Sequence, residues 1–397
     1  MNLQIGSWDL SCPDWEARLM AGSSLMPALP LWRSEADMAV EFFKNLRLPD
    51  QVGMPLLRDA CGHWFIEIVE ALFGSYDRAT ATRMISEFFI LVGKGNSKTT
   101  YSAALMLTVL LMNERPNATY FFVAPTKDTA KIAFEVVEAM IKADADLKNR
   151  FWARETILEI EDRINGAKIS VKAFSLEMMN GPKPVGILLD EIHLCALHKD
   201  AEKILRQMRG GLQKARESFL LVISTQSNEP PVGIFKDMLA EARAIRDGKI
   251  ANATMLPIIY ELPERIQKEE TLWSNPDIWP FVMPNLGRSI HMDKLKKDFD
   301  QQKRASKQAF ELWASQHLNV EMGIGSRSDG WAGAEYWLRS VHPELSRPAI
   351  EAQHPGADER EIPWLQLQAL VDRCDVLTMG IDGGGLDDLL GLNVTGR

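Results

Sequence analysis

The sequence has few cysteines, no long hydrophobic run and no excess of positive charge, and each lack excludes a class of protein. The four cysteines lie far apart and form no C-x-x-C pair, which argues against a zinc knuckle and for reduced thiols in a cytoplasm. No run of ~18 uncharged apolar residues occurs, so we expect no transmembrane helix. The formal net charge is −9, so any contact with DNA must depend on a local basic patch.

Repeats and low-complexity tracts are also missing, and the N-terminus has an early acid and no basic cluster, so no signal peptide is expected. The 397 residues contain 46% hydrophobic and 25% charged residues, as in ordinary globular proteins. The length predicts two to three domains.

Apolar runs alternate with amphipathic stretches between residues 86 and 250. The predicted strands are 88–92, 119–124, 169–173, 186–189 and 219–223. The predicted helices are 98–111, 127–141, 201–212 and 234–247. Continuous apolar strands separated by helices predict an α/β fold, with a mainly parallel sheet covered by helices on both faces. Ligands of such sheets bind at the carboxyl ends of the strands.

The flanking regions have a different character. We expect an irregular lead-in with one helix at about 34–45, a helix over 54–75, and a proline- and tryptophan-rich region with one charged helix at about 292–316. Two strands, 376–381 and 389–394, are expected last. The predicted organisation is a lead-in (1–53), a domain built on the predicted sheet (54–250), a helical subdomain (251–340), a linker (341–375) and the start of a further domain (376–397).

The first motif is a strand that enters a glycine-bearing turn and then a helix. Backbone N–H groups of such a turn and the positive end of the helix dipole bind phosphate. Lys98 is expected to reach the β- and γ-phosphates and the Thr99 hydroxyl to hold Mg²⁺. The pattern departs from G-x-x-x-x-G-K-S/T, because Val92 and Ser97 stand where glycines belong. The predicted nucleotide-binding residues are Gly93, Lys94, Gly95, Asn96, Ser97, Lys98, Thr99 and Thr100.

Two further motifs follow apolar strands. The run 186–189 ends in Asp190 and Glu191, which predicts a carboxylate that holds Mg²⁺ and a carboxylate that deprotonates the attacking water. The run 219–223 ends in Ser224, Thr225 and Gln226, polar groups that could sense the γ-phosphate. Together the three motifs predict an ATP-binding site with ATP and Mg²⁺ as its cofactors.

With these motifs, the chain resembles the large terminase subunit of tailed bacteriophages, the ATPase–nuclease that packages DNA into capsids. The resemblance extends to 123–130, 259–262, 283–287 and 316–319. It implies a P-loop NTPase-type fold, a catalytic role for Glu191 and for the early basic residue Lys94, and coupling of hydrolysis to motion by Ser224, Thr225 and Gln226. Family loops usually have Gly where this chain has Ser97.

The resemblance also implies binding partners and a cellular location. They are double-stranded viral DNA, a portal protein, a small terminase subunit and further copies of the chain in a ring on the procapsid, in the cytoplasm of the bacterial host and without a membrane. The implied function is translocation of DNA driven by ATP hydrolysis.

The last strand pair resembles the start of the family's ribonuclease-H-like nuclease domain. Asp382, followed by Gly383 and Gly384, would be the first metal-binding carboxylate. Cleavage with two metal ions needs further acids around cations ~3.5–4 Å apart, so the nuclease metal site is expected to be incomplete and the endonuclease activity missing from this chain.

Two alternatives stay open. Asp190-Glu191-Ile192-His193 also resembles the D-E-x-H box of superfamily-2 helicases, although no Q-x-x-G-R-x-x-R string follows residue 230. The departures at Ser97 and Phe65 also allow a non-catalytic nucleotide-binding module that docks on a packaging partner.

Overall fold

The computed structural model describes residues 8–77, 79–80, 82–181, 183–322, 343–358, 361–375, 377–382 and 391–396. The chain divides into two compact units, Met1–Gly323 and Ile324–Arg397. Each unit is described by itself. No helix within the described residues is long and apolar enough to cross a membrane.

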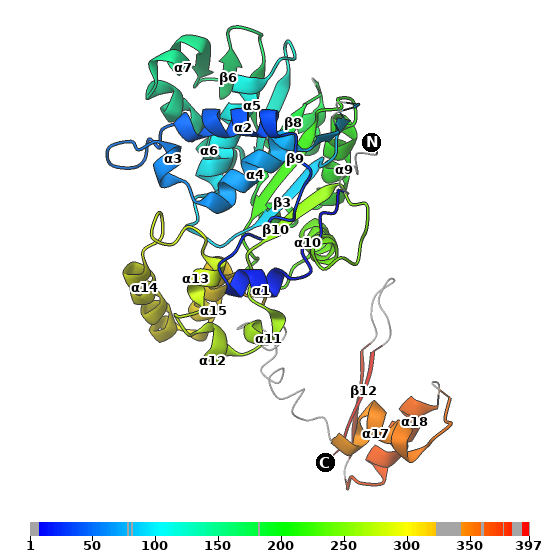
Figure 1. Cartoon of the computed structure of the whole chain (residues 1–397). Coiled ribbons are helices and arrows are strands. Elements are labelled where there is room, and N and C mark those ends of the chain that lie inside the picture. The colour runs from blue at the N-terminus through cyan, green and yellow to red at the C-terminus, as the bar shows by residue number, and fades with distance from the viewer. Residues whose placement is uncertain are drawn as a thin grey trace, which may run out of the picture. The chain divides into compact units, whose positions relative to one another are not determined.

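An eight-stranded sheet forms the centre of the first unit (Figure 1). Its order is β10 (Met255–Ile259), β3 (Glu87–Leu91), β9 (Phe219–Ser224), β8 (Gly186–Asp190), β4 (Thr119–Ala124), β7 (Lys168–Ala173), β6 (Glu159–Asp162) and β5 (Phe151–Arg154). The strands from β10 to β7 are parallel, and β6 and β5 are antiparallel. Because β4, β8, β9 and β10 are buried at every residue, their sequences are continuous apolar runs. The predicted α/β fold with a mainly parallel sheet is confirmed.

Strand β10 corrects one expectation, since Met255–Ile259 was placed in the helical region. Pro257 lies within this strand and pairs with Phe89 of β3. Proline has no N–H to donate, but β10 is the edge of the sheet, where one side of the strand needs no partner. The short hairpin of β5 and β6 was also not foreseen.

Helices cover both faces of the sheet, and Figure 1 shows α4, α5 and α6 on one side and α9 and α10 on the other. The long helices are α2 (Arg33–Asn45), α4 (His63–Gly74), α5 (Lys98–Met112), α6 (Lys127–Lys142), α9 (Ala201–Leu212) and α10 (Gly233–Arg246). Shorter elements are α1 (Trp15–Met20), α3 (Leu57–Ala60), α7 (Ala145–Arg150), α8 (Ile192–Cys195), η1 (Leu176–Met179) and the pair β1 (Tyr76–Asp77) and β2 (Thr82–Arg83). The helix expected over 54–75 is therefore two helices, because Gly62 between them has an extended backbone.

The segment 264–318 is helical and packs around aromatic side chains. It contains α11 (Glu264–Gln267), α12 (Glu270–Trp273), α13 (Trp279–Val282), α14 (Met292–Ala305) and α15 (Lys307–Leu318). The rings of Trp279, Phe299 and Trp313 lie about 5.0–5.1 Å apart, centroid to centroid. The single helix expected at 292–316 is wrong, since the chain is extended at Ser306, whose hydroxyl caps α15 by accepting the N–H of Ala309 at 3.0 Å.

The second unit contains η3 (Pro343–Leu345), α17 (Arg347–Gln353), α18 (Ile362–Val371), β11 (Leu377–Asp382) and β12 (Gly391–Gly396). The two strands pair antiparallel, with Asp382 opposite Gly391. They lie close to the two expected strands. The stretch 341–375, expected to be a linker, includes two helices. Gly383 and Gly384 lie outside the described residues, and the ribonuclease-H-like assignment and the domain boundaries remain predictions.

Candidate functional site

The sheet order brings the three predicted motifs to one edge. Strand β9 lies between β3 and β8, and all three run parallel. Their carboxyl ends carry the loop from 92 to 100, the coupling residues from 224 to 226, and the acidic pair 190–191. Backbone hydrogen bonds connect the ends: Val92 donates its N–H to the carbonyl of Ser224 at 3.1 Å, and Glu191 donates to that of Ile223 at 3.0 Å.

The loop after β3 contains two residues in the left-handed backbone region, as in the backbone turns that bind anions. Gly95 has a φ of +90° and Ser97 a φ of 57° with ψ of 25°, both in the left-handed region. This region favours glycine, which explains why glycine is usual at the position of Ser97, and it costs a serine about 1–3 kcal/mol. At Gly93 a Cβ would lie 2.2 Å from the carbonyl oxygen of His317, so no larger residue fits there.

The basic residues of the loop have different surroundings. Lys98 begins α5, and its Nζ lies 3.1 Å from Oε1 of Glu191. Thr100 follows in the first turn of this helix. Lys94 is exposed and donates its backbone N–H to the carbonyl of Gln316 at 2.7 Å. No ion pair of the Lys94 side chain is recorded among the described residues.

The acidic pair is close to the helix start. Thr99 donates its hydroxyl to Oδ2 of Asp190 at 2.7 Å, and Asp190 is only 6% exposed. Burial, together with the negative charge of Glu191, raises the pKa of Asp190 to about 6. Glu191 has a φ of 55° at the start of α8, another strained position for a residue with a side chain.

The donor set fits Mg²⁺. Oδ1 of Asp190 is buried without a hydrogen-bond partner, beside the Thr99 hydroxyl that contacts Oδ2. Carboxylate and hydroxyl oxygens suit this hard cation, which is usually held by one or two carboxylates plus the phosphates of the substrate. The described residues contain no cluster of three or more potential metal ligands from His, Cys, Asp and Glu.

Gln226, one of the three predicted coupling residues, is linked through Asn319 to the entry and the exit of the helical segment. Gln226 donates its backbone N–H to Oδ1 of Asn319 at 3.0 Å, and Asn319 donates Nδ2 to the carbonyl of Tyr260 at 2.8 Å. Gln226 and Asn319 are fully buried. Tyr260 precedes α11 and Asn319 follows α15, so one asparagine joins both ends of the segment to the coupling motif.

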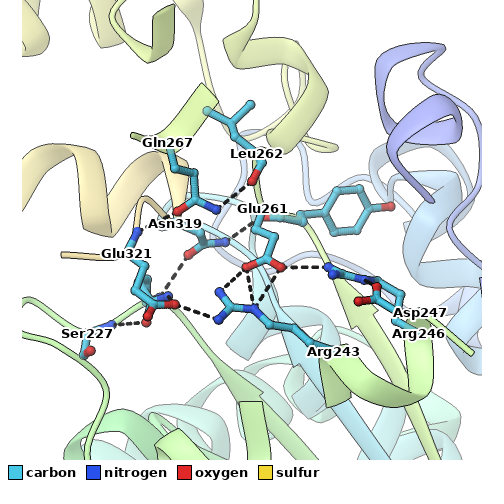
Figure 2. Close-up of polar contacts among 11 residues, drawn as sticks. Ser227, Arg243, Arg246, Asp247, Glu261, Leu262, Gln267, Asn319 and Glu321 are labelled. Atoms are coloured by element: carbon cyan, nitrogen blue, oxygen red, sulfur yellow. Dashed lines mark hydrogen bonds and ion pairs between the residues drawn. The ribbon is translucent and has the colours of Figure 1, made fainter. Parts of the chain in front are cut away.

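An ionic network surrounds this junction, with Arg246 and Glu261 buried and Arg243 and Glu321 partly exposed, and Figure 2 shows its side chains pointing toward one another. Nε of Arg243 lies 3.0 Å from Oε1 of Glu261, and Nη1 of Arg246 lies 2.7 Å from the same oxygen. Nη1 of Arg243 also lies 2.7 Å from Oε2 of Glu321. We call Arg243, Arg246, Glu261 and Glu321 the charged anchor.

A second junction, without ionic groups, lies at the phosphate loop. Asn285, between α13 and α14, donates its N–H to Oδ1 of Asn96 at 3.0 Å and its Nδ2 to Tyr101 at 2.9 Å and to Ser289 at 2.6 Å. Ser289 donates to the carbonyl of Gly95 at 2.6 Å. We call Asn285, Ser289, Asn96 and Tyr101 the loop anchor.

The structure thus assembles most of the predicted site residues and adds some that the sequence did not single out. Asp382 belongs to the second unit, at the end of β11. Asn96 of the loop anchor is among the predicted nucleotide-binding residues, but the other members of both anchors and His193, which contacts Glu191 and Ser224, are not predicted as site residues. The signals available in the sequence are the stretches 283–287 and 259–262, which contain Asn285 and Glu261 and carry part of the family resemblance, and the D-E-x-H string that contains His193.

Comparison with known proteins gives a family for the central region. Residues 63–239 match the family model described as terminase large subunit, ATPase domain. The fold resembles the large terminase of bacteriophage HK97, with a TM-score of 0.58, 15% identity, and coverage of 73% of this chain and 55% of that protein. The chain therefore spans about half of the HK97 protein. A search of curated protein sequences found no match.

Two other solved structures share smaller parts. The ATPase domain of the Thermus phage P74-26 large terminase has a TM-score of 0.31 and 17% identity, over 41% of this chain and 69% of that one. The large terminase of another thermophilic bacteriophage, in complex with ADP, has a TM-score of 0.34 and 12% identity, over 46% of this chain and 44% of that one. Both TM-scores are low, so the fold comparison depends on the HK97 protein.

Proposed function

Residues 63–239 belong to the ATPase-domain family of terminase large subunits, and on this premise we propose that the chain hydrolyses ATP to drive viral double-stranded DNA into a procapsid. The observation that carries the proposal is the meeting of Lys98 with Glu191 and of Thr99 with Asp190 across the carboxyl edge of the sheet. These pairs join a phosphate-binding loop to two carboxylates, the set of groups that phosphoryl transfer to water requires.

Phosphate binding uses the loop and the helix that follows it. The backbone N–H groups between 93 and 97 and the N-terminus of the 15-residue α5 provide partial positive charge. Lys98 supplies a full charge to the β- and γ-phosphates, and Lys94 a second one to the γ-phosphate. Thr99 and Asp190 would hold Mg²⁺, which neutralises charge on the phosphate oxygens.

Glu191 acts as the general base. Its ion pair with Lys98 occupies Oε1. A γ-phosphate competes for the same ammonium group, and when Lys98 turns to the phosphate the carboxylate is free to orient a water and accept its proton. Binding of ATP would in this way prepare the base that hydrolyses it.

Coupling follows from the contacts of Gln226. Its N–H bonds to Asn319, which also holds Tyr260, so a shift of the 224–226 turn would rotate segment 264–318 about its entry and its exit. Loss of the γ-phosphate beside Ser224, Thr225 and Gln226 is the event that starts this shift. The helical segment is the moving part of the motor.

The partners follow from the family. They are double-stranded DNA, a portal protein, a small terminase subunit and further copies of the chain in a ring, acting in the cytoplasm of a bacterial host. Asp382, at the end of β11, would be the first metal-binding carboxylate of the family's nuclease site.

Steady-state ATPase activity with and without double-stranded DNA tests the proposal. We expect hydrolysis by the wild type that DNA stimulates. We expect Lys98→Ala to lose both hydrolysis and the rise in melting temperature that ATP produces in the wild type. Lys297→Ala, on the exposed side of α14, is the matched control and should retain both. Absence of hydrolysis by the wild type with DNA and the packaging partners present would instead favour a non-catalytic docking module.

A further inference from the structure

The imidazole of His193 lies between the acidic pair and the coupling motif. Its Nδ1 is 2.9 Å from Oγ of Ser224 and 3.2 Å from Oε2 of Glu191. His193 is in the single turn of α8 that follows Glu191, so its place depends on the same strained turn. One ring nitrogen is thus within reach of both the proposed general base and the first residue of the coupling motif.

The surroundings keep the ring in place. The side chain is 10% exposed, and the ring packs edge to face against Phe235 of α10 with centroids 6.1 Å apart. Burial lowers the pKa of His193, which keeps the imidazole neutral at physiological pH. A neutral imidazole carries one N–H, so Nδ1 has at most one proton to give.

The two possible partners of Nδ1, the Glu191 carboxylate and the Ser224 hydroxyl, differ in their hydrogen-bonding capacity. A carboxylate can only accept, whereas the Ser224 hydroxyl can accept or donate. Oε2 of Glu191 is buried, and its alignment with Nδ1 falls short of a hydrogen bond. A small rotation of the imidazole would complete that bond and loosen the one to Ser224. The backbone already ties these elements, since Ser224 accepts the N–H of Val92 at the start of the phosphate loop.

We propose that His193 is a positioning residue that shares its Nδ1 proton between Glu191 and Ser224, holding the base and linking its state to the coupling motif. The inference rests on the proposed function and deepens it. When Lys98 leaves Oε1 for a γ-phosphate, the Nδ1–H group takes over at Oε2 and keeps the carboxylate aimed at water. The same rotation breaks the hydrogen bond to Ser224. The coupling motif at 224–226 therefore changes its hydrogen bonding when Glu191 is positioned to act as the base.

Two substitutions separate this role from simple packing. In His193→Asn, the amide Nδ2 can occupy the position of Nδ1 and donate to both acceptors. In His193→Leu, the volume is retained and the donor is lost. We expect His193→Leu to lower kcat by about 10- to 100-fold, the usual effect of removing a group that orients a catalytic residue. The KM for ATP should stay within about threefold, and His193→Asn should recover most of the lost kcat.

A second readout needs no hydrolysis. Nitrogen NMR of the imidazole rings, with His193 identified among the seven histidines by its loss in His193→Asn, reports the hydrogen bonds of Nδ1 directly. We expect the Nδ1 signal to move in Glu191→Gln and again in Ser224→Ala. Equal kcat values in the Leu and Asn variants, or an Nδ1 signal that ignores both substitutions, would overturn the inference. An inactive wild type with a responsive Nδ1 signal would overturn the proposed function and leave the role of His193 between the two motifs standing.

Discussion

The helical segment 264–318 joins the sheet through the loop anchor and the charged anchor, which use different chemistry. The loop anchor consists of amides and hydroxyls around Asn285, at the turn that would hold phosphate. The charged anchor consists of two arginines and two glutamates around Glu261, beside the coupling turn. Neutral hydrogen bonds are weak enough to be exchanged when a ligand arrives, whereas buried paired charges are costly to separate. The loop anchor therefore suits a joint that nucleotide rearranges, and the charged anchor suits a fixed pivot.

Breaking the charged anchor should have the largest effect on stability. The Glu261 side chain is 4% exposed and that of Arg246 is 7% exposed, so Glu261→Ala removes the buried carboxylate that Arg243 and Arg246 share and leaves them only Glu321 and Asp247. We expect a loss of about 3–5 kcal/mol in the free energy of unfolding, measured by urea denaturation. Glu264→Ala removes a glutamate whose side chain is 81% exposed and should cost less than about 0.5 kcal/mol.

Equal losses of unfolding free energy in Glu261→Ala and Glu264→Ala would contradict the interpretation of the charged anchor as a fixed pivot. So would a Glu261→Ala protein in which DNA still stimulates the ATPase to the wild-type extent, since the pivot is needed for coupling and not for ATP binding.

Breaking the loop anchor should have a smaller effect on stability but a direct one on ATP. Asn285 is fully buried, and Asn285→Ala keeps its backbone bond to Asn96 while removing the side-chain bonds. We expect a loss of about 2 kcal/mol in the free energy of unfolding. ATP should bind about tenfold more weakly in calorimetric titration, because the loop loses a support.

The control is Gln301→Ala, which changes an exposed residue of α14. Unchanged ATP affinity in Asn285→Ala would show that the loop anchor does not support nucleotide binding, contrary to the proposed difference between the two anchors.

Asp190, in the same site, is a buried carboxylate with no ion pair among the described residues, whereas the charges of the charged anchor are paired. The pKa of Asp190 is raised to about 6 in the folded protein, so ionisation of this side chain destabilises the fold. This destabilisation begins as the pH rises above the ordinary pKa, grows up to a pH of about 6 and stays constant at higher pH. Asp190→Asn should therefore stabilise the protein at pH 8 in chelating buffer, by about 3 kcal/mol at most.

The gain should shrink as the pH falls through 6 and vanish below the ordinary pKa of 3.8. A gain that is independent of pH over this range would refute the electrostatic explanation.

The smallest expected effect is at Ser97. Ser97→Gly removes the strain of a φ of 57° but also the hydroxyl that lies 3.4 Å from Nδ2 of Asn285. We expect a net stabilisation of less than about 1 kcal/mol in thermal or urea unfolding, with unchanged or tighter ATP binding. Weaker ATP binding would mean that the serine hydroxyl contributes to the loop more than its backbone strain costs.

The sequence was informative where local pattern decides structure. Apolar runs with polar ends located β3, β8 and β9, and their order in the chain correctly implied a shared edge. Pattern was misleading at Pro257, where an edge strand tolerates a residue that otherwise indicates a turn. It also missed the break at Ser306, because the charged periodicity continues across it.

The anchors could not be predicted, because they depend on which distant residues meet. Asn285 contacts Asn96, and Glu261 contacts Arg243 and Arg246 across a strand and a loop. No periodicity specifies such pairs. The sequence contains His193 only as the last residue of the Asp190–His193 motif. Its position between Glu191 and Ser224 is known only from the three-dimensional structure.

Glu191→Gln tests the central claim most directly, because it keeps the size and shape of the side chain and removes the carboxylate that acts as the base. DNA-stimulated ATP hydrolysis and the ATP-dependent rise in melting temperature would be measured side by side for the wild type and this variant. The account predicts that the variant keeps the melting shift and loses hydrolysis by at least about 100-fold. Undiminished steady-state hydrolysis in Glu191→Gln would contradict it.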